Sequence, residues 1–245
     1  MMKTLRKIGL LLGVLFMSAS LGAQDKTLLI FSGIEGSVNS EISMQVLEKA
    51  YAKLGLQIQY RPLPGERALR ASNSGAVDGE VFRIANIQKR YKNLIPVPTP
   101  INSLQALAFT KDKDIVLQDW QSLKRYRIGI QGGIKFAERT TKGMNPVVVD
   151  TNKQLFRMLD SGRIDVLIAA ESNGLKTLAD LRMKGIHALP PLIQPYPLYH
   201  YLHKKHAGLV ERLDAVLQSM QASGEIRAIR KAYLDQLGVV ERGHN

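Results

Sequence analysis

The chain of 245 residues contains no cysteine. Disulfide bonds, thiol catalysis and cysteine-ligated metal sites are therefore excluded, and so is a lipid-modified cysteine at an export signal. The sequence also shows no Ser-His-Asp nucleophile elbow, no metal-binding motif and no pair of carboxylates at a diagnostic spacing. These absences favour a protein that uses no cofactor, no metal and no catalytic residue.

Long apolar runs are equally scarce, and the one near the N-terminus is short. Residues 1–23 begin with three basic and no acidic residues, continue with an apolar run from Ile8 to Met17, and end in small residues. This order is typical of a secretory signal peptide, whereas a membrane-spanning helix needs roughly 20 apolar residues. We expect cleavage near Ala23 and a mature protein free in the periplasm of a two-membrane bacterium. An uncleaved N-terminal anchor is the alternative.

Acidic residues are few: the chain has 21 acidic and 34 basic residues, which gives a net charge of +13. Without the three basic residues of the signal peptide, 31 basic and 21 acidic residues remain, a net charge of +10. The export signal argues against nucleic acid as a partner. A positive field instead concentrates anionic solutes or favours an acidic partner surface, although a plain solubility charge would give the same count.

The first part of the mature chain alternates strand and helix patterns. Apolar residues recur at a period of two in the strands and at helical spacing in the helices. Such alternation predicts a mainly parallel sheet with helices on both faces. The predicted strands are 27–31, 56–60 and 77–84, and the predicted helices are 41–54 and 66–73.

A second, smaller unit of the same kind follows. Three prolines at 96, 98 and 100 exclude a helix before it, and residues 104–109 are extended and apolar. Its alternation predicts another α/β unit. The predicted strands are 126–130, 147–149 and 164–169, and the predicted helices are 134–141, 154–159 and 175–183.

A second proline-rich stretch, 190–197, precedes a strand at 198–202 and two terminal helices, the second with Ser223 as its N-cap. We predict an α/β fold of two lobes joined by two extended hinge crossings. Lobe 1 comprises 24–105 and 198–245, and lobe 2 comprises 106–197. Ligands of such sheets bind at the carboxyl ends of the strands, so we expect a site in a cleft that closes by hinge motion.

Three short motifs carry a family resemblance. They are the segment Gly75-Ala76-Val77-Asp78-Gly79 leading to Arg90, the segment Leu159-Asp160-Ser161-Gly162-Arg163-Ile164-Asp165, and the terminal segment Ser223-Gly224-Glu225-Ile226 leading to Tyr233. In this order they resemble family 3 of the periplasmic solute-binding proteins, which includes the polar amino-acid receptors of ABC transporters. The resemblance covers essentially the whole mature chain and implies the type II periplasmic-binding-protein fold.

The resemblance implies that an arginine after a lobe 1 strand holds the ligand carboxylate, and by position this residue is Arg90. A guanidinium group matches a carboxylate with two parallel donors. Arg83, near the end of the 77–84 strand, is a second candidate, and Arg67, at the start of a short helix, is a third. Each of them could instead be a solvated or ion-paired surface residue.

The candidates in lobe 2 are Gly133 and Lys135, in a turn that follows a strand and begins a helix, where backbone N–H groups attract anions. The resemblance implies an acid after the next strand to hold an α-ammonium group. Ala170 occupies that place and Glu171 follows it. Glu35, in the first loop of lobe 1, could also contact a ligand amine. The departure at Ala170 shifts the expectation towards an anion.

We therefore expect a monomeric periplasmic solute-binding protein, not an enzyme, that captures a small anionic or zwitterionic solute and serves an inner-membrane permease. The alternatives are a sensor without a transport role and a dehydratase-like enzyme of the same fold, in which Glu171 or Glu35 would be the acid or base. Three histidines spaced by three residues, His200, His203 and His206, could hold a metal only on a helix, and their segment favours a strand.

Overall fold

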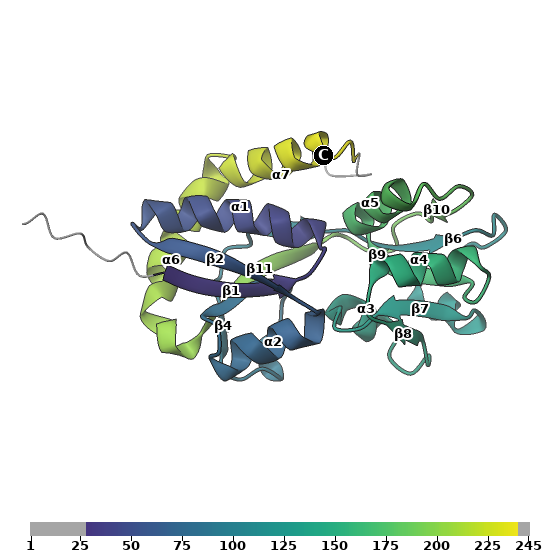
Figure 1. The fold of residues 1–245 in the computed structure, drawn as a ribbon, viewed down its shortest axis with the longest axis horizontal. Coiled ribbons are helices and arrows are strands. Elements are labelled where there is room, and N and C mark those ends of the chain that lie inside the picture. The colour runs from purple at the N-terminus through teal and green to yellow at the C-terminus, as the bar shows by residue number, and fades with distance from the viewer. Residues whose placement is uncertain (1–27, 240–245) are drawn as a thin grey trace, which may run out of the picture.

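The computed structural model describes residues 28–239 and divides them between two sheets. Figure 1 shows two α/β lobes side by side, with the terminal helices packed on the first. None of the helices between residues 28 and 239 is long and apolar enough to span a membrane. The predicted signal peptide lies outside the described residues.

Lobe 1 is built on a sheet whose strand order is β2-β1-β3-β11-β4, with β5 also paired to β11. The strands β1, β2 and β3 run parallel, and β11 is antiparallel to its neighbours. The bounds are β1 Leu28–Ile34, β2 Gln57–Leu63, β3 Gly79–Ile84, β4 Leu94–Pro96, β5 Asn102–Leu104 and β11 Tyr196–His203, with helices α1 Val38–Lys53 and α2 Gly65–Ser74.

The core of lobe 1 contains a buried aromatic group in which Tyr51 and His200 pack around Phe31. The His200 Nδ1 atom lies 3.2 Å from the Val81 carbonyl oxygen, which can only accept, so Nδ1 carries the proton and Nε2 accepts from the Tyr51 hydroxyl at 2.9 Å. Burial lowers the pKa of His200 to about 4. His200 is therefore an uncharged core residue at neutral pH.

Lobe 2 has the strand order β10-β6-β9-β7-β8, in which β7, β8 and β9 run parallel and β6 is antiparallel to both of its neighbours, β9 and β10. Phe109 and Phe156 are buried at its centre. The bounds are β6 Ala106–Thr110, β7 Ile128–Gln131, β8 Val147–Val149, β9 Val166–Ala170 and β10 His187–Ala188, with helices α3 Lys135–Thr140, α4 Asn152–Asp160 and α5 Glu171–Leu181.

Two crossings connect the lobes, as the sequence predicted. The extended run 104–109 is divided between them, because β5 ends at Leu104 in lobe 1 and β6 begins at Ala106 in lobe 2. A single residue, Gln105, makes the first crossing. The second runs from β10 to β11, and because β11 begins at Tyr196 the expected boundary between residues 197 and 198 falls inside this strand.

The chain ends with helices α6 (Val210–Ala222) and α7 (Glu225–Gln236), which pack against α1. The prediction that Ser223 is the N-cap of the second helix was wrong. Ser223 is the C-cap of α6, where its hydroxyl donates to the Met220 carbonyl oxygen. Gly224 is the N-cap of α7, because the tight link between the helices needs a positive φ, here +76°, that glycine adopts without steric cost.

Candidate functional site

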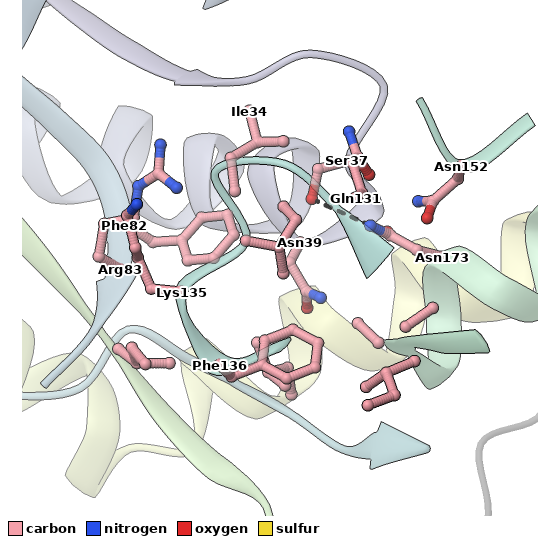
Figure 2. A pocket seen from close by; sticks show the side chains of 16 residues that line it. Ile34, Ser37, Asn39, Phe82, Arg83, Gln131, Lys135, Phe136, Asn152 and Asn173 are labelled. Carbon is pink, nitrogen blue, oxygen red and sulfur yellow. Dashed lines mark hydrogen bonds between the residues drawn. The ribbon is translucent and has the colours of Figure 1, made fainter. Parts of the chain in front are cut away.

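A cavity lies between the lobes at the carboxyl ends of their parallel strands (Figure 2). It has a volume of about 30 Å³ for the centres of water molecules, which is room for one or two waters. The lobes are therefore closed on each other. The residues that line the cavity are Ile34, Ser37, Asn39, Phe82, Arg83, Ile84, Leu104, Gln131, Ile134, Lys135, Phe136, Asn152, Ile168, Ala169, Ala170 and Asn173.

Four helices begin at this cavity. Ser37 is the N-cap of α1 and Ala170 the N-cap of α5, while Lys135 and Asn152 are the first residues of α3 and α4. All four residues line the cavity. A helix N-terminus carries a partial positive charge and unpaired N–H groups, so the helices of both lobes direct a positive potential into the same space.

Arg83 and Lys135 are the charged residues among those that line the cavity. Arg83 is 2% exposed, and its guanidinium group contacts both lobes. It donates to the Gly65 carbonyl oxygen of lobe 1 at 2.8 Å and to the Gly133 carbonyl oxygen of lobe 2 at 3.1 Å. Arg83 therefore joins the two sides of the closed cleft.

The charge of Arg83 is balanced by Glu80, a fully buried neighbour on β3. Arg83 Nε lies 2.8 Å and Nη2 2.7 Å from Glu80 Oε1, and the hydroxyls of Ser32 and Ser72 each lie 3.0 Å from Oε2. Burial raises the pKa of Glu80, and Arg83 and the two hydroxyls oppose that rise. The four side chains form one buried polar network beneath the cavity.

Lys135 makes the second charged link between the lobes. Its Nζ atom lies 2.7 Å from Glu66 Oε2 of α2 and 2.8 Å from Glu138 Oε2 of its own helix. The Tyr91 hydroxyl donates to the same Glu66 carboxylate at 2.9 Å. Although burial opposes ionisation, Lys135 and Tyr91 hold the pKa of Glu66 below its usual value. The pair is therefore ionised at neutral pH.

The opposite side of the cleft is closed by uncharged contacts between α1 and α5. The Val38 N–H donates to Asn173 Oδ1 at 2.8 Å, and Asn39 Nδ2 donates to Ser172 Oγ at 3.4 Å. A longer contact of 3.5 Å joins Asn173 to Ser37, the dashed line in Figure 2. Amide groups thus line one part of the cavity, and the rings of Phe82 and Phe136 line another.

The structure brings three of the sequence-predicted site residues together. Arg83 and Lys135 line the cavity, and the Gly133 carbonyl oxygen accepts from Arg83. Glu35 lines a wider opening that shares Ser37, Gln131, Asn152 and Asn173 with the cavity. This opening is the outer mouth of the cleft.

The other three predicted residues do not line the cavity. Glu171 is buried at the start of α5, where its N–H donates to the Gln105 carbonyl oxygen. Arg67 is exposed on α2. The Arg90 side chain is 71% exposed, with Nη2 3.9 Å from Glu66 Oε1. Their ligand-binding roles stay predictions.

Five polar residues that line the cavity were missed by the sequence analysis. They share one property: each lies at the end of a strand or in the first turn of a helix. That position could have identified them from the sequence, because the junctions between a strand and the following helix lie on the side of such sheets where ligands bind. The missed residues are Ser37, Asn39, Gln131, Asn152 and Asn173.

The three histidines lie apart from the cavity. His200 is the core residue of lobe 1, and His206 Nε2 lies 2.7 Å from Asp78 Oδ1. His203 ends β11, which extends one residue beyond the predicted strand 198–202. Among residues 28–239, no three His, Cys, Asp or Glu side chains are grouped as a metal site.

Comparison with known proteins places this geometry in context. A family model for the bacterial extracellular solute-binding proteins, family 3, matches residues 41–236. A protein of Shewanella oneidensis whose function is uncharacterised is 31% identical over 186 residues, which cover 71% of this chain and 69% of that protein.

Solved structures with the same arrangement include three of different character. An ancestral arginine-binding protein bound to arginine has a TM-score of 0.70 and 17% identity, over 84% of this chain and 97% of that one. A histidine kinase sensor domain with similarity to periplasmic binding proteins has a TM-score of 0.73 and 17% identity, over 85% of this chain and 96% of that one. An ancestral amino-acid-binding protein, a precursor of cyclohexadienyl dehydratase, has a TM-score of 0.67 and 16% identity, over 84% of this chain and 95% of that one. At these identities the likeness confirms the two-lobed fold.

Proposed function

Because the chain belongs to family 3 of the bacterial extracellular solute-binding proteins, we propose that it captures a small carboxylate-bearing solute between its lobes. Hinge closure would trap the solute, and an inner-membrane ABC permease would receive it. The mature protein would act in the periplasm. The protein would capture and deliver the solute without changing it chemically.

The observation that carries this proposal is the meeting of four helix N-termini at one cavity. Their partial positive charges stabilise an anionic group. Among the residues lining the cavity, the charged ones are the cations Arg83 and Lys135, while the acids Glu80 and Glu66 lie behind them. A carboxylate would therefore meet donors from both lobes.

Hinge closure is supported by the kind of contacts that hold the lobes together. The link from Lys135 to Glu66 and the bonds from Arg83 to Gly133 and from Val38 to Asn173 are all polar. Water can replace these polar contacts when the lobes separate. Apolar residues of both lobes also belong to one buried cluster, so the exposure of part of that cluster adds to the cost of opening. A solute would enter the open form, and the lobes would then close around it less tightly than around the one or two waters for which this cavity has room.

An enzymatic role has less support. Acid–base catalysis needs a titratable group within hydrogen-bond reach of the substrate. The residues that line the cavity include no aspartate, glutamate or histidine. Glu35 reaches only the outer mouth, and Glu171 does not line the cavity.

The test is a thermal-unfolding screen of the common amino acids and small dicarboxylates, each paired with its carboxamide analogue. A carboxylate ligand at about 100 times its Kd should stabilise the protein by about 2.7 kcal/mol. The uncharged carboxamide should bind on the order of 100-fold more weakly, because the cationic donors lose a charged partner. If no compound raised Tm, the proposal that the protein captures a small solute would be wrong. If the carboxamide bound as tightly as the carboxylate, the proposal that the site recognises a carboxylate would be wrong.

A matched pair of variants assigns the site. Lys135→Met removes a cation from the cavity and should weaken binding about tenfold or more. Lys142→Met changes an exposed lysine just beyond the same helix and should leave affinity unchanged. Without ligand, Lys142→Met should keep the wild-type Tm, because the replaced lysine is exposed. Lys135→Met should lower Tm, because it leaves Glu66 and Glu138 without their mostly buried cation.

A further inference from the structure

Lobe 1 has one strongly basic face, formed by residues 65–78, 86–93 and 203–206. These segments contain seven lysines and arginines but only two acids, Glu66 and Asp78. By contrast, residues 210–236 of the terminal helices carry four basic and four acidic residues. The excess of positive charge is therefore dense on this face, whose 26 residues carry a net charge of +5, the same as the 92 residues 106–197 with 14 basic and nine acidic residues. The seven basic residues, all exposed, are Arg67, Arg70, Lys89, Arg90, Lys92, Lys204 and Lys205.

Hydrogen bonds hold the three segments side by side. Asn93 joins the first two, since its N–H donates to Asn73 Oδ1 at 3.0 Å and its Nδ2 to the Asn73 carbonyl oxygen at 2.8 Å. The Lys204 N–H donates to the Asn93 carbonyl oxygen at 2.8 Å, and Lys205 Nζ donates to the Gly75 carbonyl oxygen at 3.1 Å. The basic residues therefore share one continuous surface, on the side of α2 and β4 in Figure 1.

The two acids on this face are already engaged by the protein. Glu66 is held by Lys135 and Tyr91, and Asp78 accepts from the Ile30 N–H at 2.7 Å as well as from His206. Among the described residues 28–239, no ion pair within 4 Å joins Arg67, Lys89, Lys92 or Lys204 to an acid, whereas the other three basic residues pair with Glu66 or Asp78. The four without such a pair present their full charge to solvent.

This face lacks the apolar centre that protein partners use. Interfaces between proteins gather aromatic and aliphatic side chains at their core. The large exposed hydrophobic residues of the described chain, Leu28, Val116, Val147 and Val148, all lie outside the three segments. A layer of anionic lipid headgroups requires only positive charge, at about 1 kcal/mol per lysine or arginine.

We propose that the basic face binds the surface of a membrane rich in anionic phospholipids. Exposed lysines and arginines would contact the headgroup phosphates without insertion of apolar side chains. The face adjoins the cleft, because Glu66 belongs to it and pairs with Lys135 across the lobes. Binding would hold the Glu66–Lys135 side of the cleft, rather than its outer mouth at α1 and α5, close to the membrane. This inference does not depend on which solute the cleft accepts.

The test is co-sedimentation of the full mature protein with vesicles of phosphatidylcholine that contain about one-third phosphatidylglycerol. At low ionic strength the protein should sediment with these vesicles and not with pure phosphatidylcholine. The variant K89E/K92E/K204E should lose binding by on the order of 100-fold. Added salt near 1 M should release the wild type, because the Debye length then falls to about 3 Å.

The matched control is K113E/K124E/K184E, which makes the same change in net charge at exposed lysines of lobe 2. It should bind nearly as well as the wild type, and both variants should keep the wild-type Tm. Equal losses in the two variants would overturn the proposal, since binding would then follow net charge alone. It is also overturned if soluble polyglutamate, but not the vesicles, binds through Lys89, Lys92 and Lys204, because the partner would then be an acidic protein.

Discussion

Arg83 stabilises the fold and lines the proposed site at the same time. Its contacts with Glu80, Gly65 and Gly133 use most of its five N–H donors. Little of the guanidinium group remains for a solute, so Arg83 acts mainly by fixing the cleft walls. The side chain that the sequence marked as a ligand cation is held in place by the protein's own carboxylate.

The Arg83–Glu80 pair yields a stability prediction. Arg83→Ala leaves the fully buried Glu80 without its cation and should lower the free energy of unfolding by about 3–5 kcal/mol. The double variant R83M/E80Q removes both charges and should recover most of that loss. Urea unfolding of the two variants measures both values. If R83A and R83M/E80Q were equally destabilised, Arg83 would matter through its hydrogen bonds to Gly65 and Gly133 rather than through the charge of Glu80.

At the scale of elements, the start of α2 lies against the turn before α3, and we expect this contact to limit the proposed closure. A Cβ atom at Gly133 would lie 2.4 Å from the Glu66 backbone nitrogen. Gly133→Ala should therefore prevent full closure and weaken ligand binding by about tenfold or more, as the competent closed form becomes rare. Calorimetric titration measures the affinity, and small-angle scattering measures the larger radius of the liganded protein.

Gly143→Ala provides the matched control for this prediction. Gly143 has a φ of +77°, close to the +78° of Gly133, but its Cβ would meet nothing within 4 Å. Both variants should lose roughly 1–2 kcal/mol of stability from backbone strain. Only Gly133→Ala should lose affinity. Equal affinity in the two variants would show that the α2–α3 contact does not limit closure.

The elements that the sequence predicted best are those in which burial follows a simple period. The parallel strands and most helices of both lobes lie within a few residues of their expected positions. Helix α5 begins at Glu171 rather than at 175, because its first turn buries polar residues such as Ser172 and Asn173. A pattern based on apolar residues cannot detect a turn whose buried side chains are polar and face a cleft.

The partners of the site residues were beyond prediction for a different reason. Arg83 contacts Gly65 and Gly133, which lie 18 and 50 residues away in sequence. Such pairing depends on how two lobes meet, and no local period in the chain records it. The predicted helix starts and strand ends located the region of the site. The pairing of its cations with buried acids could be seen only in the structure.

For the whole molecule, closure should leave a distinct mark on hydrogen exchange. The Val38 N–H is bonded across the cleft to Asn173 Oδ1, whereas the Ile30 N–H is bonded within lobe 1 to Asp78 Oδ2, at similar distances of 2.8 and 2.7 Å. Ligand should slow exchange at Val38 by about tenfold or more and leave Ile30 unchanged. Residue-resolved exchange with and without ligand measures both, and equal slowing would point to global stabilisation instead.

The position of β11 in the sheet of lobe 1 also affects how the chain acquires its structure. This strand lies between β3 and β4 in space, yet it follows the whole of lobe 2 in sequence. Lobe 2 is a continuous segment whose contacts are local, and local contacts form early. The inserted lobe can therefore fold first, while lobe 1 must wait for β11, which follows lobe 2 in sequence, before its sheet is complete.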